Sequence, residues 1–140
     1  MNEYRTYNCN QITLNDVGKE VRIAGFVETI RDLGGVVFLD VRDMYGVTQV
    51  VTQGASSNLV DYASHIPIES TVTVLGTVRK RDEETFNNRI ATGEVELLVD
   101  SLEVLSPSLH ELPFNIILCT SWAVFEIVFS FTRWKYSSFI

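Results

Sequence analysis

Apolar and polar side chains alternate along several stretches of this 140-residue chain, with the period of two that is typical of strands burying one face. The first stretch, residues 19–30, places Val21, Ile23 and Val27 on a single face. Between the third and fourth stretches, residues 57–66 predict a short helix with Ser57 as its N-cap. The pattern predicts five strands, at residues 19–30, 36–41, 47–52, 71–81 and 94–105.

Two glycines, Gly25 and Gly76, lie inside predicted strands, where a glycine indicates a bulge or a tight bend. Three strands, a short helix and two more strands, with such bends, are typical of the OB-fold. This fold is an all-β, five-stranded Greek-key barrel whose strand 2–3 face and adjoining loops bind oligonucleotides. A mixed open sheet with one helix is the alternative, and it explains the two glycines less well.

Composition limits the classes of function. Charged residues make up 21% and apolar residues 46%, which fits a single globular domain. The formal net charge of −7 argues against binding nucleic acid through bulk positive charge, but it leaves open a local site that reads a few bases. Cys9 and Cys119 lack zinc-ligand or disulfide spacing and no apolar signal segment opens the chain, so we expect a cytoplasmic protein.

No arrangement in the sequence is typical of catalysis or of metal binding. His65 and His110 have no nucleophile in any recognisable spacing. Asp40 and Asp43 flank Arg42, and two strand-end acids beside an arginine more often form a structural ion-pair network than a catalytic pair. We therefore assign no catalytic residue and no metal site.

Four segments carry a family resemblance: YRTYNCNQI, VGKEVRIAGFVETIRDLGGVVFLDVRDMYGVTQVV, VLGTVRKRDEE and ATGEVELLVDSLEVLSPSLHELPF. In order and spacing they resemble the N-terminal anticodon-binding domain of bacterial-type aspartyl-tRNA synthetases, from Tyr4 to about Phe114. The resemblance implies an OB-fold that recognises the tRNA anticodon as part of an aspartate–tRNA ligase. The alternative is a stand-alone OB-fold that binds single-stranded nucleic acid without anticodon preference, with a steep salt dependence.

The resemblance places three anticodon-reading positions at Arg31, Phe38 and Gln49. It implies that Phe38 stacks on the middle uracil, that Gln49 pairs with that base's Watson–Crick edge, and that Arg31 contacts a neighbouring base or phosphate. An aromatic platform is worth about 1–3 kcal/mol per base, and a glutamine amide offers a donor and an acceptor together. Taken singly, each has a plainer interpretation: Phe38 as core, Gln49 as a solvated strand residue, Arg31 as a surface charge.

A second set of positions surrounds the loop between the fourth and fifth strands. A carboxylate at Glu96 can accept from the amino and imino edge of guanine or from the amino group of cytosine. The plain alternative for RKRDEE, residues 79–84, is a solvated loop of mixed charge. The resemblance implies anticodon contacts here from Arg79, Arg81, Thr85, Asn87 and Glu96, with Asn88 beside them.

Three positions depart from the family within the predicted barrel. Phe26 stands where the family usually has tryptophan, and Thr29 and Ile30 stand where it usually has basic residues. Two missing positive charges should weaken attraction to the phosphate backbone and flatten the salt dependence of binding.

The chain departs most from the family at its end. Residues 115–140 hold 16 apolar residues among 26, and no class II synthetase motif occurs in them. We expect residues 1–114 to form the OB-fold and residues 115–140 to be an unrelated tail, introduced by a frameshift, a read-through or a cloning boundary. A membrane anchor or a homodimer contact is the alternative, although the apolar run is short for a membrane helix and contains Glu126.

The resemblance implies ATP and Mg²⁺ only for the catalytic domain, which has no counterpart here. This chain alone should therefore bind tRNA and not catalyse. A homodimer is expected only for the full-length family enzyme, and no membrane partner is expected.

Overall fold

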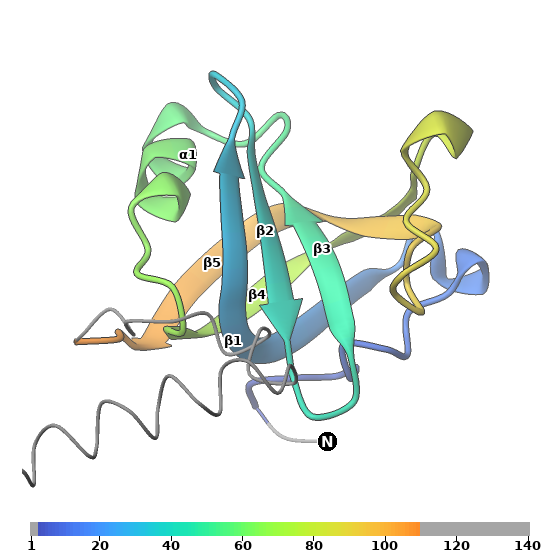
Figure 1. The fold of residues 1–140 in the computed structure, drawn as a ribbon, viewed down its shortest axis with the longest axis horizontal. Helices are drawn as coiled ribbons and strands as arrows, with labels where there is room; N and C mark the ends of the chain where they lie inside the picture. Colours follow the sequence, from blue (N-terminus) through green and yellow to red (C-terminus); the bar gives the residue numbers. More distant parts are fainter. Residues whose placement is uncertain (1–2, 110–140) are drawn as a thin grey trace, which may run out of the picture. The chain divides into compact units, whose positions relative to one another are not determined.

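Five strands close into a barrel in the computed structural model, which describes residues 3–109 (Figure 1). The elements are β1 (Glu20–Asp32), β2 (Val37–Arg42), β3 (Val47–Val51), the helix α1 (Ser57–Ser64), β4 (Thr71–Lys80) and β5 (Val95–Ser106). Around the barrel the order is β1, β2, β3, β5, β4. The neighbours are antiparallel except for β3 and β5, which run parallel. This is the predicted five-stranded OB-fold with one short helix.

The inward faces of the strands fill the barrel with aliphatic side chains, which confirms the predicted alternation. In β2 the buried Val37, Leu39 and Val41 alternate with Phe38 and Asp40, whose side chains are only half-buried. Burying apolar area contributes roughly 25 cal/mol per Å² to folding, so this alternation fixes which face of β2 points outward. The outward face of β2 is the one that the resemblance assigns to nucleic acid.

Gly25 and Gly76 lie where a neighbouring strand approaches too closely for a side chain. A Cβ at Gly25 would lie 2.3 Å from the backbone oxygen of Arg42, and a Cβ at Gly76 would lie 2.1 Å from that of Leu98. The register between β4 and β5 also shifts between Leu75 and Gly76, as it does at a bulge. The prediction of a bulge is therefore confirmed at Gly76, and Gly25 permits the close packing of β1 against β2.

The N-cap of α1 is Ser56, so the prediction of Ser57 was wrong by one residue. The side-chain oxygen of Ser56 accepts a hydrogen bond from the backbone N–H of Leu59 at 3.4 Å. Ser56 keeps an extended backbone while Ser57 is already helical, and an N-cap needs the non-helical conformation. The helix packs against β1 and β2 and buries Ala63.

The expected domain boundary at residue 114 and the apolar tail, residues 115–140, lie outside the described residues, as do Cys119 and His110. Between residues 3 and 109, no helix is both long and apolar enough to cross a membrane.

Candidate nucleic-acid interface

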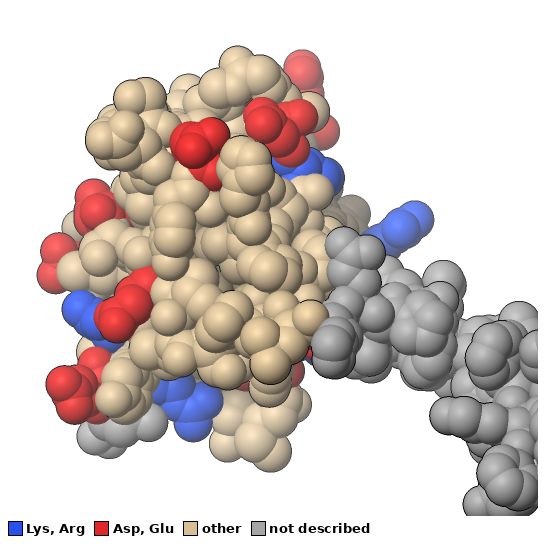
Figure 2. All heavy atoms as spheres, turned by 90° about the vertical axis from the view of Figure 1, so that its left-hand side faces the viewer, with Lys and Arg blue, Asp and Glu red and all other residues tan. Residues whose placement is uncertain are grey.

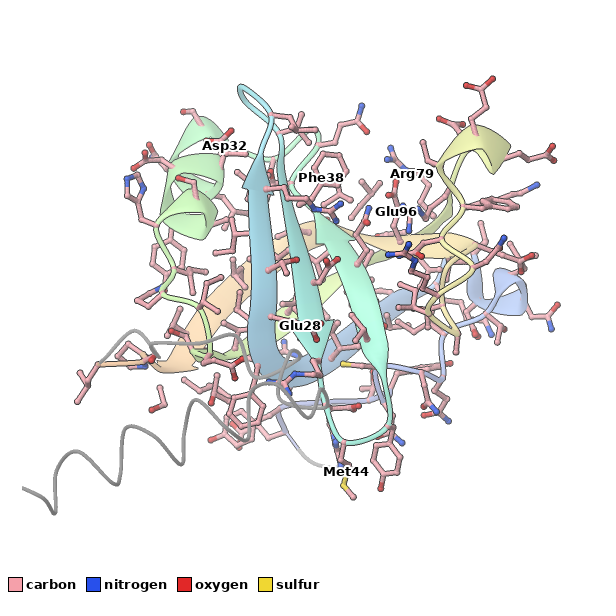
Figure 3. The ribbon with its side chains drawn as sticks, viewed as in Figure 1. Glu28, Asp32, Phe38, Met44, Arg79 and Glu96 are labelled. Carbon is pink, nitrogen blue, oxygen red and sulfur yellow. The ribbon has the colours of Figure 1, made fainter. Side chains whose placement is uncertain are left out.

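One outer face of the barrel gathers polar and aromatic side chains from every strand. Arg31 of β1 is opposite Phe38 of β2, and Arg79 of β4 is opposite Glu96 of β5. Gln49 of β3 lies beside Glu96, because β3 is the neighbour of β5 around the barrel. Figure 3 shows Phe38, Arg79 and Glu96 on the same side of the molecule. The fold thus brings together residues separated by up to 65 positions in the chain.

Phe38 is an outward aromatic side chain and does not belong to the hydrophobic core. It is half-buried, and the buried neighbours on either side of it point into the barrel. The guanidinium carbon of Arg31 lies 5.8 Å from the centre of the Phe38 ring. An arginine at this distance adds cationic character to an aromatic surface, as proteins that stack single-stranded bases often do.

Gln49 is buried, although it points outward from β3. Its side chain is covered by its hydrogen-bond partners, and the residue is only 4% exposed. The amide oxygen accepts from Nη2 of Arg31 at 3.2 Å, and Nε2 donates to Oε2 of Glu96 at 3.2 Å. A primary amide has two N–H donors and two lone pairs, so each end of the group keeps one further hydrogen-bonding position.

Glu96 is held on both of its oxygens by other side chains of the barrel. Oε1 accepts from Nε of Arg79 at 2.9 Å and also from Nη2 of the same residue. Oε2 accepts from Gln49, and Glu96 as a whole is 6% exposed. Arg79 in turn donates from Nη1 to Oε1 of Gln53 at 2.8 Å. Hydrogen bonds of this kind offset the cost of removing a charged carboxylate from water. Glu96 is thereby the central residue of a chain of hydrogen-bonded side chains.

These side chains line a hollow of about 510 Å³ beside the loop between β4 and β5. A volume of this size is within the usual range for ligand sites of about 300–1,000 Å³. Seven of the eight residues predicted as nucleic-acid contacts line it: Arg31, Phe38, Gln49, Arg79, Arg81, Thr85 and Glu96.

Asn87, the eighth, is not among the residues lining this hollow. Its side-chain oxygen accepts from the backbone N–H of Arg89 at 3.0 Å, and its backbone N–H donates to the oxygen of Gly93 at 3.1 Å. In the structure Asn87 therefore organises the loop between β4 and β5.

Four further residues line the hollow that the sequence did not single out: Leu33, Gln53, Lys80 and Asp82. Leu33 could have been found, because an apolar side chain in a polar Gly-Gly turn has no core to enter, and it is 70% exposed. Gln53 carries no such signal, because its place depends on how the loop after β3 folds back towards Arg79.

Arg81 brings unpaired donors to the hollow. Its Nε and Nη1 atoms are buried, yet neither has a hydrogen-bond partner among the residues that the structure describes. Buried donors without a partner are costly, so an anionic group placed beside them would be favoured. Together with Lys80, Arg81 gives the hollow a positive rim suited to phosphate.

A separate ion-pair network lies further along β2. Arg42 pairs with Glu28 at 3.4 Å and with Glu69 at 2.8 Å, and it lies 5.9 Å from the centre of the Phe26 ring. Burial raises the pKa of the Glu28 carboxyl above its ordinary value, although Arg42 acts in the opposite direction. Asp40 pairs instead with Arg31, at 3.3 Å. Asp43 pairs with Arg5 at 3.8 Å, so the predicted network of Asp40, Arg42 and Asp43 was wrong in its partners: Arg42 pairs with Glu28 and Glu69 instead.

In Figure 2, the face that bears α1 shows no cluster of basic side chains like the one around the hollow. Figure 2 views the molecule from that side, and its acidic and basic side chains are scattered over a mostly uncharged surface. The hollow, which is lined by Arg31, Arg79, Lys80 and Arg81, is therefore the stronger candidate for a site that binds a polyanion.

The sequence of this chain is similar to a family of known domains. The profile of the family described as "OB-fold nucleic acid binding domain" matches residues 21–105. Aspartate–tRNA(Asp/Asn) ligases of Rickettsia bellii and Rickettsia prowazekii are 47% and 46% identical over 116 residues. The match covers 83% of this chain and 19% of each relative, so the chain spans about a fifth of the length of these ligases.

Two solved structures share the fold. An asparaginyl-tRNA synthetase from Pyrococcus horikoshii matches with a TM-score of 0.63 and 31% identity, over 78% of this chain and 24% of that one. A putative aspartyl-tRNA synthetase from Leishmania major matches with a TM-score of 0.70 and 27% identity, over 82% and 23%.

Proposed function

The chain belongs to the family of OB-fold nucleic acid binding domains and is homologous to the N-terminal domain of aspartyl- and asparaginyl-tRNA synthetases, and on that premise we propose that its hollow binds the anticodon loop of a tRNA. The observation that carries the proposal is the joint position of Phe38, Gln49 and Arg81. An outward aromatic ring, a buried amide and a guanidinium with two unpaired nitrogens line one hollow.

Each of the three groups suits one part of an unstacked nucleotide. The Phe38 ring offers a platform for the base, because every base has a π-face. The free positions of the Gln49 amide suit a Watson–Crick edge, which is exposed only in single-stranded RNA. Arg81 and the neighbouring Arg79 and Lys80 suit phosphates, since guanidinium and ammonium groups bind them through charge-assisted hydrogen bonds.

The middle anticodon base is the nucleotide that we assign to Phe38 and Gln49. The names of the Rickettsia relatives state that they act on both Asp and Asn tRNA. The corresponding anticodons, G-U-C and G-U-U, share their first two bases, so a site that reads the middle uracil serves either tRNA. Extending this dual substrate range to the parent of this chain is part of the proposal.

Binding of RNA stem-loops to the 140-residue chain, followed by fluorescence anisotropy, tests the proposal. Phe38→Ala and Gln49→Ala should each weaken binding of a G-U-C loop by at least about tenfold, as expected when a base loses its platform or its hydrogen-bonding partner. Met44→Ala is the matched control, since Met44 is an apolar side chain that is 85% exposed at the far end of β2 (Figure 3). This variant should bind like the wild type.

The panel of RNAs separates this function from general single-strand binding. G-U-C and G-U-U loops should bind alike, and a loop with a changed middle base should bind more weakly. Unchanged affinity in both Phe38→Ala and Gln49→Ala would contradict the assignment of this face. Equal binding of all loops with a steep salt dependence would favour a stand-alone OB-fold without anticodon preference.

For the full-length ligase we propose ATP-dependent joining of aspartate to tRNA in the cytoplasm, by a homodimer. Within residues 3–109 no group of three or more His, Cys, Asp or Glu side chains could hold a metal ion. The ATP and Mg²⁺ that the resemblance implies belong, in this proposal, to the larger part of the ligases, which this chain does not cover.

A further inference from the structure

We propose that Glu96 and Arg31 determine which pyrimidine Gln49 reads, by holding its side-chain amide in one of two orientations. The inference deepens the proposed function and rests on it, because it takes Gln49 as the residue that pairs with the base. It makes Glu96 a positioning residue for base selection.

A free glutamine is an ambiguous reader. Rotation of its terminal amide by half a turn exchanges the positions of the oxygen and the nitrogen, and the two arrangements have almost the same shape. An amide that rotates freely presents either a donor or an acceptor at a given point in space. Such a residue could pair with uracil in one orientation and with cytosine in the other.

The contacts of Gln49 leave one orientation. Arg31 has only donors, so the group facing its Nη2 atom at 3.2 Å must be the amide oxygen. Glu96 as a carboxylate has only acceptors, so the group facing its Oε2 atom at 3.2 Å must be the amide nitrogen. After a half turn, the nitrogen would face the guanidinium and the oxygen would face the carboxylate. Both hydrogen bonds would become repulsive contacts.

Glu96 is fixed before any ligand arrives. Arg79 binds its other oxygen through two nitrogens, and Gln53 holds Arg79 from the far side. Because other barrel side chains hold both of its oxygens, the Glu96 carboxylate is fixed in the position that orients the Gln49 amide. The inference adds an orienting role to the base contact that the resemblance implied for this residue.

The fixed orientation has a chemical consequence at the base edge. Uracil carries the O4 acceptor beside the N3–H donor, and the remaining N–H and lone pair of Gln49 match that pair. Cytosine carries an amino donor and an N3 acceptor at the same two positions. With the amide fixed, the N–H of Gln49 would face the amino group of cytosine, and the oxygen of Gln49 would face the N3 acceptor. A rotated amide could instead form both hydrogen bonds with cytosine.

The ratio of affinities for stem-loops with uracil and with cytosine at the middle position, measured on the full chain, tests this inference. Glu96→Gln keeps the size of the side chain, but Arg79 should hold its amide oxygen, so that an NH₂ group faces Gln49 and the hydrogen bond that orients the Gln49 amide is lost. A matched pair of hydrogen bonds discriminates between bases by roughly 5- to 150-fold, and we expect Glu96→Gln to reduce the uracil preference at least about fivefold. Most of this change should come from tighter binding of the cytosine loop.

Two further variants keep the test decisive. Arg31→Met removes the donor that faces the amide oxygen, from a side chain that is 53% exposed and whose loss the barrel should tolerate. It should also reduce the preference, even as binding of every loop weakens. Asp100→Asn is the matched control: it removes one negative charge from the same strand at an exposed site and should leave the ratio unchanged.

The outcomes separate the inference from its premise. If the wild type prefers uracil and neither Glu96→Gln nor Arg31→Met changes that preference, the orienting role is wrong while the anticodon function stands. If the wild type binds both loops equally, the reading of a base by Gln49 is wrong, and the role of Glu96 falls with it.

Discussion

Asp16, just ahead of β1, organises the turn that leads into the barrel. Its carboxylate accepts from Nζ of Lys19 at 2.8 Å and from the backbone N–H and the hydroxyl of Thr13, each at 3.0 Å. These hydrogen bonds, the one from Lys19 first, lower the pKa of Asp16 from 3.8 to about 2. A carboxyl with a depressed pKa in the folded state stabilises the fold when ionised.

We expect this contribution to be present above about pH 4 and to be lost as the pH falls through the folded-state pKa of about 2. Asp16→Asn should therefore lower the urea midpoint of unfolding at pH 7. The difference from the wild type should shrink between pH 4 and pH 2. Urea titrations at pH 7, 4, 3 and 2 measure this convergence.

Glu103→Gln, at an exposed position of β5, is the control for removing a negative charge. Its difference from the wild type should stay small across the same pH range. A constant gap between Asp16→Asn and the wild type down to pH 2 would contradict the assignment.

At the scale of residues, the resemblance predicted most of the site, but the sequence could not supply the contacts within it. Arg31, Phe38 and Gln49 fall in one motif and could be found together. The hydrogen bond between Gln49 and Glu96 joins residues 47 positions apart, and it exists because β3 and β5 are neighbours in the closed barrel. Alternation along a strand carries no information about which strand lies next to it.

At the scale of elements, α1 offers two adjacent serines that differ in their capping role. Ser56 caps the helix through the N–H of Leu59, and Ser57 is its first helical residue. Replacing a serine N-cap by alanine costs about 1 kcal/mol. Ser56→Ala should therefore lower the free energy of unfolding by about that amount, whereas Ser57→Ala should leave it unchanged or raise it by a few tenths of a kcal/mol, because alanine has the higher helix propensity. Chemical denaturation of both variants measures the difference, and equal losses would contradict the assignment of the cap.

Element types were predictable where a local physical rule decided them. The strands followed from alternation, and the bulge at Gly76 followed from a glycine inside a strand. The helix start was missed by one residue because two serines stand in sequence and composition does not say which keeps the extended backbone. The short 3-10 turn at Glu83–Thr85 was also missed, since a polar loop gives no periodic signal.

At the scale of the whole molecule, the net charge is −7, yet the hollow is lined by a local cluster of cations. Arg31, Arg79, Lys80 and Arg81 line the hollow, and the first three are already paired with carboxylates. These four cations can make at most four phosphate contacts to single-stranded RNA. A plot of the logarithm of the association constant against the logarithm of the salt concentration should therefore have a slope no steeper than about −3. Anisotropy titrations of a stem-loop between low and moderate NaCl concentrations measure it.

A slope steeper than about −5 would mean that cations outside the hollow carry the binding. Thr29 bears on this prediction, because the family usually has a basic residue there. In this chain the Thr29 hydroxyl donates to Asp40 at 2.5 Å and offers no charge to a phosphate.

The seam between β3 and β5, where these two parallel strands pair, is short enough to affect the local dynamics of the site. The two strands share two register pairs, Val50 with Leu97 and Val51 with Leu98, whereas β4 and β5 pair along most of their length. A short ladder opens more readily than a long one, and every such opening would part Gln49 from Glu96. An RNA bound in the hollow, which both residues line, would hold this shortest ladder of the barrel closed. Amide hydrogens along this seam should exchange with solvent more slowly once the loop is bound.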